Sequence, residues 1–237
     1  MTRILVIVHE PSCSSGRLGQ LWRNVGADVV EINAWNHPVP PIVDADALVV
    51  LCGSMSCQDD AEAPWLAPTR QLISRTVRAG TPFLGICLGH QLATVALGGQ
   101  VCTSDHFCLG AAEMHLTPEG KKDPLLSVYD GHRGIHFNND VAVVLPEDAV
   151  LLARDPTGQI EAVRFAERAW GVQFHPECTP EIFDAWTIGH GEKEWQQRLP
   201  WSEAVTVAET VRRDIDTVNA EEAFAARFQE LIDPEKR

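Results

Sequence analysis

The chain has 237 residues, of which 45% are hydrophobic, and its formal net charge is −14. This length supports one sizeable core and is short for two full domains. The acidic balance argues against binding to nucleic acid or to an anionic membrane through bulk electrostatics, and no stretch approaches the roughly 20 apolar residues of a membrane span.

Seven cysteines are scattered along the chain without paired spacing, and we identify no secretory signal. We therefore expect reduced thiols and a cytoplasmic protein. Cys52 and Cys57 are too far apart for the usual spacing of a zinc knuckle, and no cluster of histidine and cysteine accompanies them. We interpret both as packing residues and expect no metal site.

Apolar runs in the first part of the chain predict buried strands at 3–8, 29–32 and 46–51. Helical spacing of apolar residues occurs around 18–22 and over 65–78. Strands that alternate with helices are typical of a doubly wound, mostly parallel α/β sheet, and this is the fold class we predict.

His9 and Glu10 follow the first predicted strand. Open α/β sheets carry their sites at the carboxyl ends of their strands. A contact of these two residues with a substrate or partner is therefore one interpretation of this loop.

An apolar strand that stops abruptly at Cys87 dominates the stretch from Thr81 to Gln91. Gly85 and Gly89 flank the cysteine, and a helical pattern follows. A strand, a sharp turn and a helix with a nucleophile at the apex form the elbow of Gly-x-Ser-x-Gly hydrolases, here with sulfur in place of oxygen. The glycines allow backbone to approach backbone, and the helix N-terminus favours a thiolate. Cys87 is a candidate nucleophile, although a single cysteine can also be inert packing.

A second motif consists of Gln173-Phe174-His175-Pro176-Glu177, which we interpret as the end of a short strand. Residues two apart on a strand point to the same side, so His175 and Glu177 are expected to face one site. An imidazole can take the proton of a thiol, and a carboxylate can hold the ring in the correct tautomer. Together the two motifs predict a catalytic triad of Cys87, His175 and Glu177.

The sequence resembles the class I, triad-type glutamine amidotransferase domain in Gly85-Ile86-Cys87-Leu88-Gly89-His90-Gln91 and in Gln173-Phe174-His175-Pro176-Glu177. Leu51-Cys52-Gly53-Ser54-Met55-Ser56 is similar to that family's Gly-Gly-Pro-Met-Ser loop, and Gly98-Gly99-Gln100-Val101 is similar to its post-helix turn. The resemblance covers most of residues 1–186, with the motifs in the family's order. Within the family, the chain looks closest to stand-alone proteins similar to the glutaminase part of guanosine monophosphate synthetase.

This resemblance implies a flavodoxin-like fold and hydrolysis of the side-chain amide of glutamine through a γ-glutamyl thioester on Cys87. It implies an oxyanion hole of backbone N–H groups at or next to Gly53 and at Leu88, where negative charge develops on the carbonyl oxygen. It also implies contacts to the bound amino acid from Ser54, Gln91, Asn139 and Asp140.

No cofactor is required by this chemistry. The chain holds no nucleotide-binding loop of its own, so the resemblance implies a separate synthetase that accepts the ammonia.

Two stretches depart from the family pattern. The chain has Cys108-Leu109-Gly110-Ala111 where the family commonly carries Glu-Ile-Gly-Trp, so a carboxylate and an aromatic ring are missing. It has His136-Phe137-Asn138-Asn139-Asp140 where the family commonly has His-Trp-His-Gly-Asp. The triad is untouched, but these departures leave open whether free glutamine is the only γ-glutamyl compound accepted.

The second half of the chain predicts short strands at 101–106, 113–117, 134–137, 141–145, 150–153, 161–165 and 170–174. We expect them to be antiparallel additions to the sheet. We expect one amidotransferase domain over 1–187 and an extension over 188–237. In the extension a connection leads to two amphipathic helices, one from Ser202 and one from Ala220, that pack back on the same domain.

Three functions remain open at this point. The first is a glutaminase that supplies ammonia to a biosynthetic partner. The second is a stand-alone hydrolase of other γ-glutamyl amides or peptides, which the departures at Cys108 and Ala111 favour. The third is a catalytically silent relative that acts as a binding module, which the intact Cys87, His175 and Glu177 disfavour.

Overall fold

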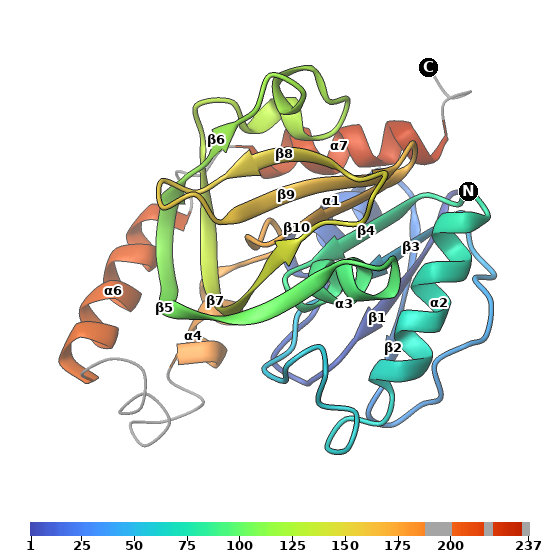
Figure 1. Cartoon of the computed structure of the whole chain (residues 1–237), viewed down its shortest axis with the longest axis horizontal. Helices are drawn as coiled ribbons and strands as arrows, with labels where there is room; N and C mark the ends of the chain where they lie inside the picture. Colours follow the sequence, from blue (N-terminus) through green and yellow to red (C-terminus); the bar gives the residue numbers. More distant parts are fainter. Residues whose placement is uncertain (188–200, 216–219, 234–237) are drawn as a thin grey trace.

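An eight-stranded sheet forms the centre of the molecule, with helices on both faces (Figure 1). The structure is a computed structural model and describes residues 1–187, 201–215 and 220–233. The strand order is β2-β1-β3-β4-β10-β9-β8-β6. This architecture confirms the predicted doubly wound, mostly parallel α/β fold.

Five neighbouring strands of the sheet run parallel: β2 (Asp28–Asn33), β1 (Arg3–Val8), β3 (Ala47–Val50), β4 (Phe83–Ile86) and β10 (Ala169–Val172). The connecting helices are α1 (Gly16–Asn24), α2 (Leu66–Arg78) and α3 (Leu88–Ala96). Because parallel strands end at the same edge, the loops after β1, β3, β4 and β10 meet there.

The side chains of β1 alternate between two hydrophobic cores. Ile4, Val6 and Val8 face the core that contains α1 and the C-terminal helices, whereas Leu5 and Ile7 face the core that contains α2 and α3. A strand buried on both faces has no polar side, which explains the nearly unbroken apolar run in its sequence.

Three antiparallel strands complete the sheet: β9 (Ile160–Ala166), β8 (Val150–Arg154) and β6 (His115–Leu116). The long strands β5 (Gln100–Glu113) and β7 (Arg133–Val144) pair only with each other in the described residues. The predicted strands 134–137 and 141–145 are therefore one strand. Short 3-10 helices η1 (Gly120–Lys122) and η2 (Leu126–Tyr129) lie between β6 and β7.

The prediction that the late strands are antiparallel additions to the sheet is wrong for β5 and β7, which form a separate two-stranded sheet, and for the direction of β10. Strand β10 pairs antiparallel with β9 on one side and parallel with β4 on the other. The hydrophobic pattern of a strand reports its burial and not the direction of its neighbour, so the sequence could not reveal this.

Three helices follow the sheet: α4 (Pro180–Thr187), α6 (Trp201–Asp214) and α7 (Glu221–Ile232). Helix α7 packs on α1, where the rings of Trp22 and Phe228 lie 5.7 Å apart and Trp22 Nε1 donates to the carbonyl of Ala225 at 3.1 Å. The expected connection over 188–200 lies outside the described residues.

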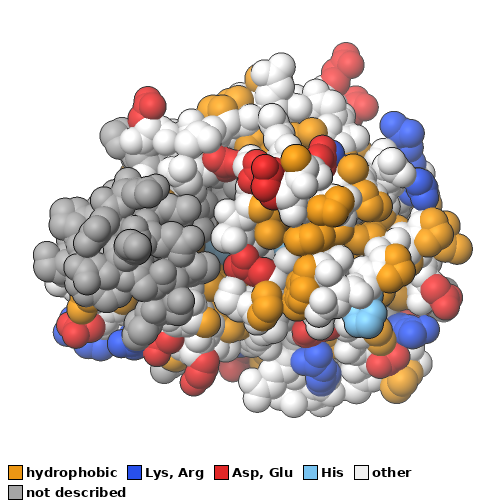
Figure 2. All heavy atoms as spheres, turned by 90° about the horizontal axis from the view of Figure 1, so that it is seen from below, with side chains coloured by type: hydrophobic (Ala, Val, Ile, Leu, Met, Phe, Trp, Pro, Cys, Tyr) orange, Lys and Arg blue, Asp and Glu red, His pale blue; other side chains and the backbone are white. Residues whose placement is uncertain are grey.

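The surface carries scattered acidic groups. On the face shown in Figure 2, hydrophobic side chains gather near the centre while acidic side chains are dispersed around them. Val143 and Val144, at the end of β7, are almost half exposed. Within the described ranges, no helix combines the length and the apolar character that crossing a membrane requires.

Phe228→Ala is expected to lower the free energy of unfolding by about 3–5 kcal/mol, because it removes a fully buried ring that packs on Trp22. Urea denaturation followed by tryptophan fluorescence measures this change. Arg227→Ala is the matched control on the exposed side of α7, with an expected change within about 0.5 kcal/mol. Equal effects of the two substitutions would contradict the packing of α7 on α1.

Candidate active site

The predicted nucleophile lies in a sharp turn between β4 and α3. Cys87 has φ 51° and ψ −106° and is the single non-glycine residue with positive φ in the described part of the chain. A Cβ at Gly85 would lie 2.6 Å from the carbonyl oxygen of Gly89, and a Cβ at Gly89 would lie 2.0 Å from that of Val50. Both glycines are therefore required by backbone-to-backbone contact.

His175 and Glu177 come together in the loop after β10, and not on a strand as the sequence interpretation assumed. Strand β10 ends at Val172. His175 Nδ1 lies 2.8 Å from Glu177 Oε1, and both side chains are buried. A carboxylate only accepts, so Nδ1 carries the hydrogen. The backbone N–H of His175 donates to the carbonyl of Ile135 at 2.8 Å, which anchors this loop to β7.

The environment of His175 favours its charged form. Burial alone would lower the pKa of His175, but the carboxylate of Glu177 and the sulfur of Cys87 outweigh it and raise the pKa to about 10. His175 Nε2 is buried and has no hydrogen-bond partner among the described residues. An imidazolium next to the sulfur can stabilise a thiolate and later deliver a proton.

A row of side-chain amides reaches the nucleophile from Gln173 and Gln91. Gln173 Nε2 donates to Cys87 Sγ at 3.4 Å, and Gln173 Oε1 accepts from Gln91 Nε2 at 3.3 Å. Gln91 Nε2 also donates to the carbonyl of Asp140 at 2.8 Å. The sequence interpretation gave no role to Gln173, although its position two residues before His175 is a signal that could have identified it.

The residues predicted to contact the amino acid lie in two places. Gln91 is buried, and its amide is bonded to Gln173 and Asp140. Asp140 also accepts from Thr103 Oγ1 at 2.9 Å through its own carboxylate, and Asn139 is half-buried beside it on β7. Ser54 is exposed on the loop after β3 and does not join this group.

The loop 52–56 contains Gly53, one of the two predicted oxyanion donors, and we call it the oxyanion loop for that prediction. It lies against the start of α3. A Cβ at Gly53 would lie 2.8 Å from Leu88 Cδ2, so the two predicted oxyanion donors are neighbours. Leu88 is the first residue of α3, where the backbone N–H has no acceptor within the helix. The backbone N–H of Ser54 is engaged with Glu10 Oε2 at 3.2 Å.

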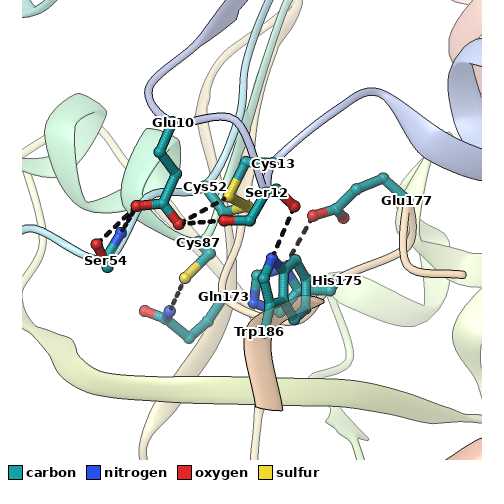
Figure 3. The surroundings of a disulfide bond; sticks show 10 residues. All are labelled: Glu10, Ser12, Cys13, Cys52, Ser54, Cys87, Gln173, His175, Glu177 and Trp186. Atoms are coloured by element: carbon teal, nitrogen blue, oxygen red, sulfur yellow. Dashed lines mark hydrogen bonds and ion pairs between the residues drawn. A yellow bond between two sulfur atoms is a disulfide. The ribbon is translucent and has the colours of Figure 1, made fainter. Parts of the chain in front are cut away.

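A disulfide joins Cys13 and Cys52, which corrects the expectation that every cysteine is reduced and that Cys52 only packs (Figure 3). Cys13 lies in the loop 9–15 after β1, and Cys52 lies just after β3. Strands β1 and β3 are neighbours in the sheet, so these loops emerge side by side. The remaining cysteines, Cys57, Cys87, Cys102, Cys108 and Cys178, are free.

Cys52 also lies close to the histidine–glutamate pair. Ligand-type atoms of Cys52, His175 and Glu177 lie within 4.8 Å of one another. The sulfur of Cys52 is part of the disulfide and is therefore not a thiolate ligand, and His175 Nδ1 is bonded to Glu177 Oε1.

Trp186 of α4 packs against the His175 ring, with ring centroids 4.5 Å apart (Figure 3). Its Nε1 donates to the carbonyl of Ser12 at 3.0 Å. This buried indole was not predicted to belong to the site, and it restricts the access of water to the imidazole.

The two residues after β1 have different environments. His9 is buried and its Nδ1 accepts from Trp65 Nε1 at 3.2 Å, and burial lowers its pKa to about 3. It is therefore neutral and serves packing. Glu10, like Cys13, contacts the oxyanion loop.

A second buried pair, also unpredicted, supports β7. His136 Nε2 lies 2.7 Å from Glu161 Oε2, and His136 Nδ1 lies 3.0 Å from the carbonyl of Gly134. The pair ties β7 to β9, and the neighbouring residue Ile135 accepts from the backbone of His175.

Known proteins are similar to this chain in sequence and in fold. The family model of class-I glutamine amidotransferases matches residues 18–189. The chain therefore belongs to the class-I glutamine amidotransferase family.

Individual relatives are similar at modest identity. The glutamine amidotransferase-like protein YfeJ of Salmonella typhimurium is 29% identical over 198 residues, covering 81% of this chain and 82% of that protein. A glutamine-hydrolysing GMP synthase subunit of Halobacterium salinarum is 30% identical, covering 75% of this chain and 90% of that protein.

Two further matches are similar either in fold alone or over a short segment. The crystal structure of a glutamine amidotransferase from Methylobacillus flagellatus superposes with a TM-score of 0.83 at 22% identity, covering 98% of this chain and 95% of that one, which shows the fold. The GMP synthase of Marinobacter nauticus is 37% identical over 115 residues, which are 42% of this chain and 20% of that protein.

The raised pKa of His175 predicts a pH dependence of stability. The native state holds a proton that the unfolded chain releases near pH 6.5, so the stabilisation is complete below that pH and is lost as pH rises through about 10. The free energy of unfolding of the wild type should therefore fall more steeply over this range than that of His175→Gln. His37→Gln, at an exposed histidine, should behave like the wild type. The same pH dependence of the free energy of unfolding in the wild type and in His175→Gln would contradict a raised pKa of His175.

Proposed function

We propose that this protein is a cysteine-dependent glutaminase of the amidotransferase type, which hydrolyses the side-chain amide of L-glutamine and supplies ammonia to a separate acceptor enzyme. The observation that carries the proposal is the conjunction of a thiol at a strained strand-to-helix turn with a buried, protonated His175 bonded to Glu177.

In the first step, the Cys87 thiolate attacks the side-chain carbonyl carbon of glutamine. Backbone N–H groups at Gly53 and Leu88 stabilise the oxyanion that forms. His175 then donates its proton to the departing nitrogen, so that ammonia leaves and a γ-glutamyl thioester remains on the sulfur.

In the second step, water attacks the thioester. His175, which is neutral after the first step, accepts the proton of that water, and the sulfur leaves as a thiolate with glutamate as product. Glu177 keeps Nδ1 protonated and stabilises the imidazolium in both steps. The Trp186 indole limits the entry of bulk water on this side of the imidazole.

The nature of the acceptor is inferred from relatives. The protein of Halobacterium salinarum is, by its name, one glutamine-hydrolysing part of a GMP synthase, so an analogous synthetase partner is the proposal for this chain. The partly exposed Val143 and Val144 offer an apolar surface for such a partner. The expected cytoplasmic location stays a prediction, as does the division into a domain at 1–187 and an extension at 188–237.

A second candidate function is the hydrolysis of other γ-glutamyl amides or peptides. The observation that favours it is the side chain of Cys108, where the family commonly has glutamate. Its sulfur lies 3.8 Å from Gln159 Oε1 and brings no negative charge for an α-amino group. Ser54, Gln91, Asn139 and Asp140 remain the proposed contacts to the amino-acid end of the substrate.

The direct experiment is steady-state ammonia release from glutamine and from a panel of γ-glutamyl amides. Wild-type protein should turn over at least one of them, and Cys87→Ala should lose at least ~10³-fold in kcat with an unchanged melting temperature. The preferred substrate decides between the two candidates. Turnover that survives in Cys87→Ala, or no turnover by the wild type with its expected partner present, would contradict the proposal.

Glu177→Gln is expected to lower kcat by about 10²–10⁴-fold, because an amide of the same size no longer holds the protonated His175 in place. KM should change little. Glu147→Gln, an exposed carboxylate before β8, is the control and should retain full activity. A Glu177→Gln variant with the kcat of the control would exclude a role of this carboxylate in turnover.

A further inference from the structure

The β1–α1 loop, residues 9–15, holds the oxyanion loop at the two positions that flank Gly53. On one side of Gly53, the disulfide binds Cys52 to Cys13. On the other side, Glu10 Oε2 accepts from Ser54 N–H at 3.2 Å and from Ser54 Oγ at 2.6 Å. The N–H of Gly53, the predicted oxyanion donor, therefore lies between two residues that are each bonded to the β1–α1 loop.

Glu10 is itself held in place by its own loop. Its Oε1 accepts from Ser12 Oγ at 2.7 Å and lies 3.5 Å from the sulfur of Cys13 (Figure 3). One carboxylate therefore connects the disulfide to the exposed Ser54 end of the oxyanion loop.

The same loop reaches the base. The carbonyl of Ser12 accepts from Trp186 Nε1, and the Trp186 ring packs on His175. The segment 9–15 thus contacts both the predicted oxyanion donor loop and the residue that covers the imidazole.

We propose that the Cys13–Cys52 disulfide and Glu10 are positioning residues for the oxyanion hole, and that opening the disulfide lowers the turnover of this enzyme. This inference rests on the proposed function. Donors that stabilise an oxyanion act only when they point at the position the charge will occupy. A released Cys52 lets the Cys52–Gly53 peptide rotate away from that position.

A dithiol can reduce the Cys13–Cys52 disulfide. The dithiol supplies two electrons and two protons, the sulfur–sulfur bond breaks, Cys13 and Cys52 become thiols, and the reductant becomes a disulfide. Reoxidation reverses these changes, so turnover follows the dithiol/disulfide balance around the protein.

The test compares kcat and KM for oxidised wild type, wild type reduced with dithiothreitol, the same sample after reoxidation, Cys13→Ser and Glu10→Gln. Thiol counting verifies the state of the disulfide. Because oxyanion stabilisation acts on the transition state, reduction and either substitution should lower kcat about tenfold or more and leave KM within about twofold. Reoxidation should restore the wild type, and reduction should have no further effect on Cys13→Ser.

Cys102→Ser, at an exposed free thiol, is the matched control and should respond to reduction like the wild type. A γ-glutamyl aldehyde, which forms a tetrahedral adduct with the sulfur, separates positioning from general loss of structure. On reduction or substitution, the affinity of the enzyme for this aldehyde should fall by the same factor as kcat/KM, whereas its affinity for glutamate should not change.

An unchanged kcat after verified reduction and in Cys13→Ser would overturn the inference, as would a loss of kcat accompanied by equal weakening of glutamate binding. Either outcome leaves the proposed function intact. Absence of Cys87-dependent turnover in the oxidised wild type would instead overturn the proposed function, so the two failures are distinguishable.

Discussion

The arrangement of the site depends on the close approach between the first turn of α3 and the strands beside it. Because Gly89 has no side chain, α3 packs directly against the carbonyl of Val50. Because Gly85 has none, β4 packs directly against α3. The turn this contact requires forces Cys87 into a backbone conformation that costs of the order of 1–3 kcal/mol. The surrounding sheet sustains this strain, which is why the sulfur emerges at a fixed point next to a helix N-terminus.

The parallel sheet assembles the remaining groups around that point. Strands β1, β3 and β10 end at the same edge of the sheet as β4, so the loops that follow them bring Glu10, Gly53 and His175 to the side on which Cys87 lies, although these residues are far apart in the chain. The imidazole is supported from β7 through Ile135, from the same loop through Glu177 and from α4 through Trp186. Each support is buried, so the electrostatic interactions within the site are strengthened by the low local dielectric.

The sequence predicted the parts of the site that depend on short spacing. The Gly-x-Cys-x-Gly pattern predicted the turn at Cys87 because only a tight turn requires glycine at both positions. The pairing of His175 with Glu177 followed from their separation by one residue, although the assumed strand geometry was wrong. The alternation of predicted strands and helices, together with the family resemblance carried by these motifs, predicted the fold.

The parts that the sequence did not reveal depend on contacts between distant segments. The disulfide joins residues 39 apart, and its formation requires β1 and β3 to be neighbours, which the strand order and not the local pattern decides. Gln173 and Gln91 meet because the start of α3 and the loop after β10 converge. The direction of β10 is likewise a property of the assembled sheet.

Locating the residue that a reactive glutamine analogue modifies is the most direct test of the account. Such an analogue carries an electrophile at the side-chain carbonyl, and peptide mapping by mass spectrometry identifies the modified residue. The account predicts one adduct, on Cys87, that excess glutamine or the preferred γ-glutamyl substrate suppresses. Modification of another cysteine with Cys87 left free would contradict it.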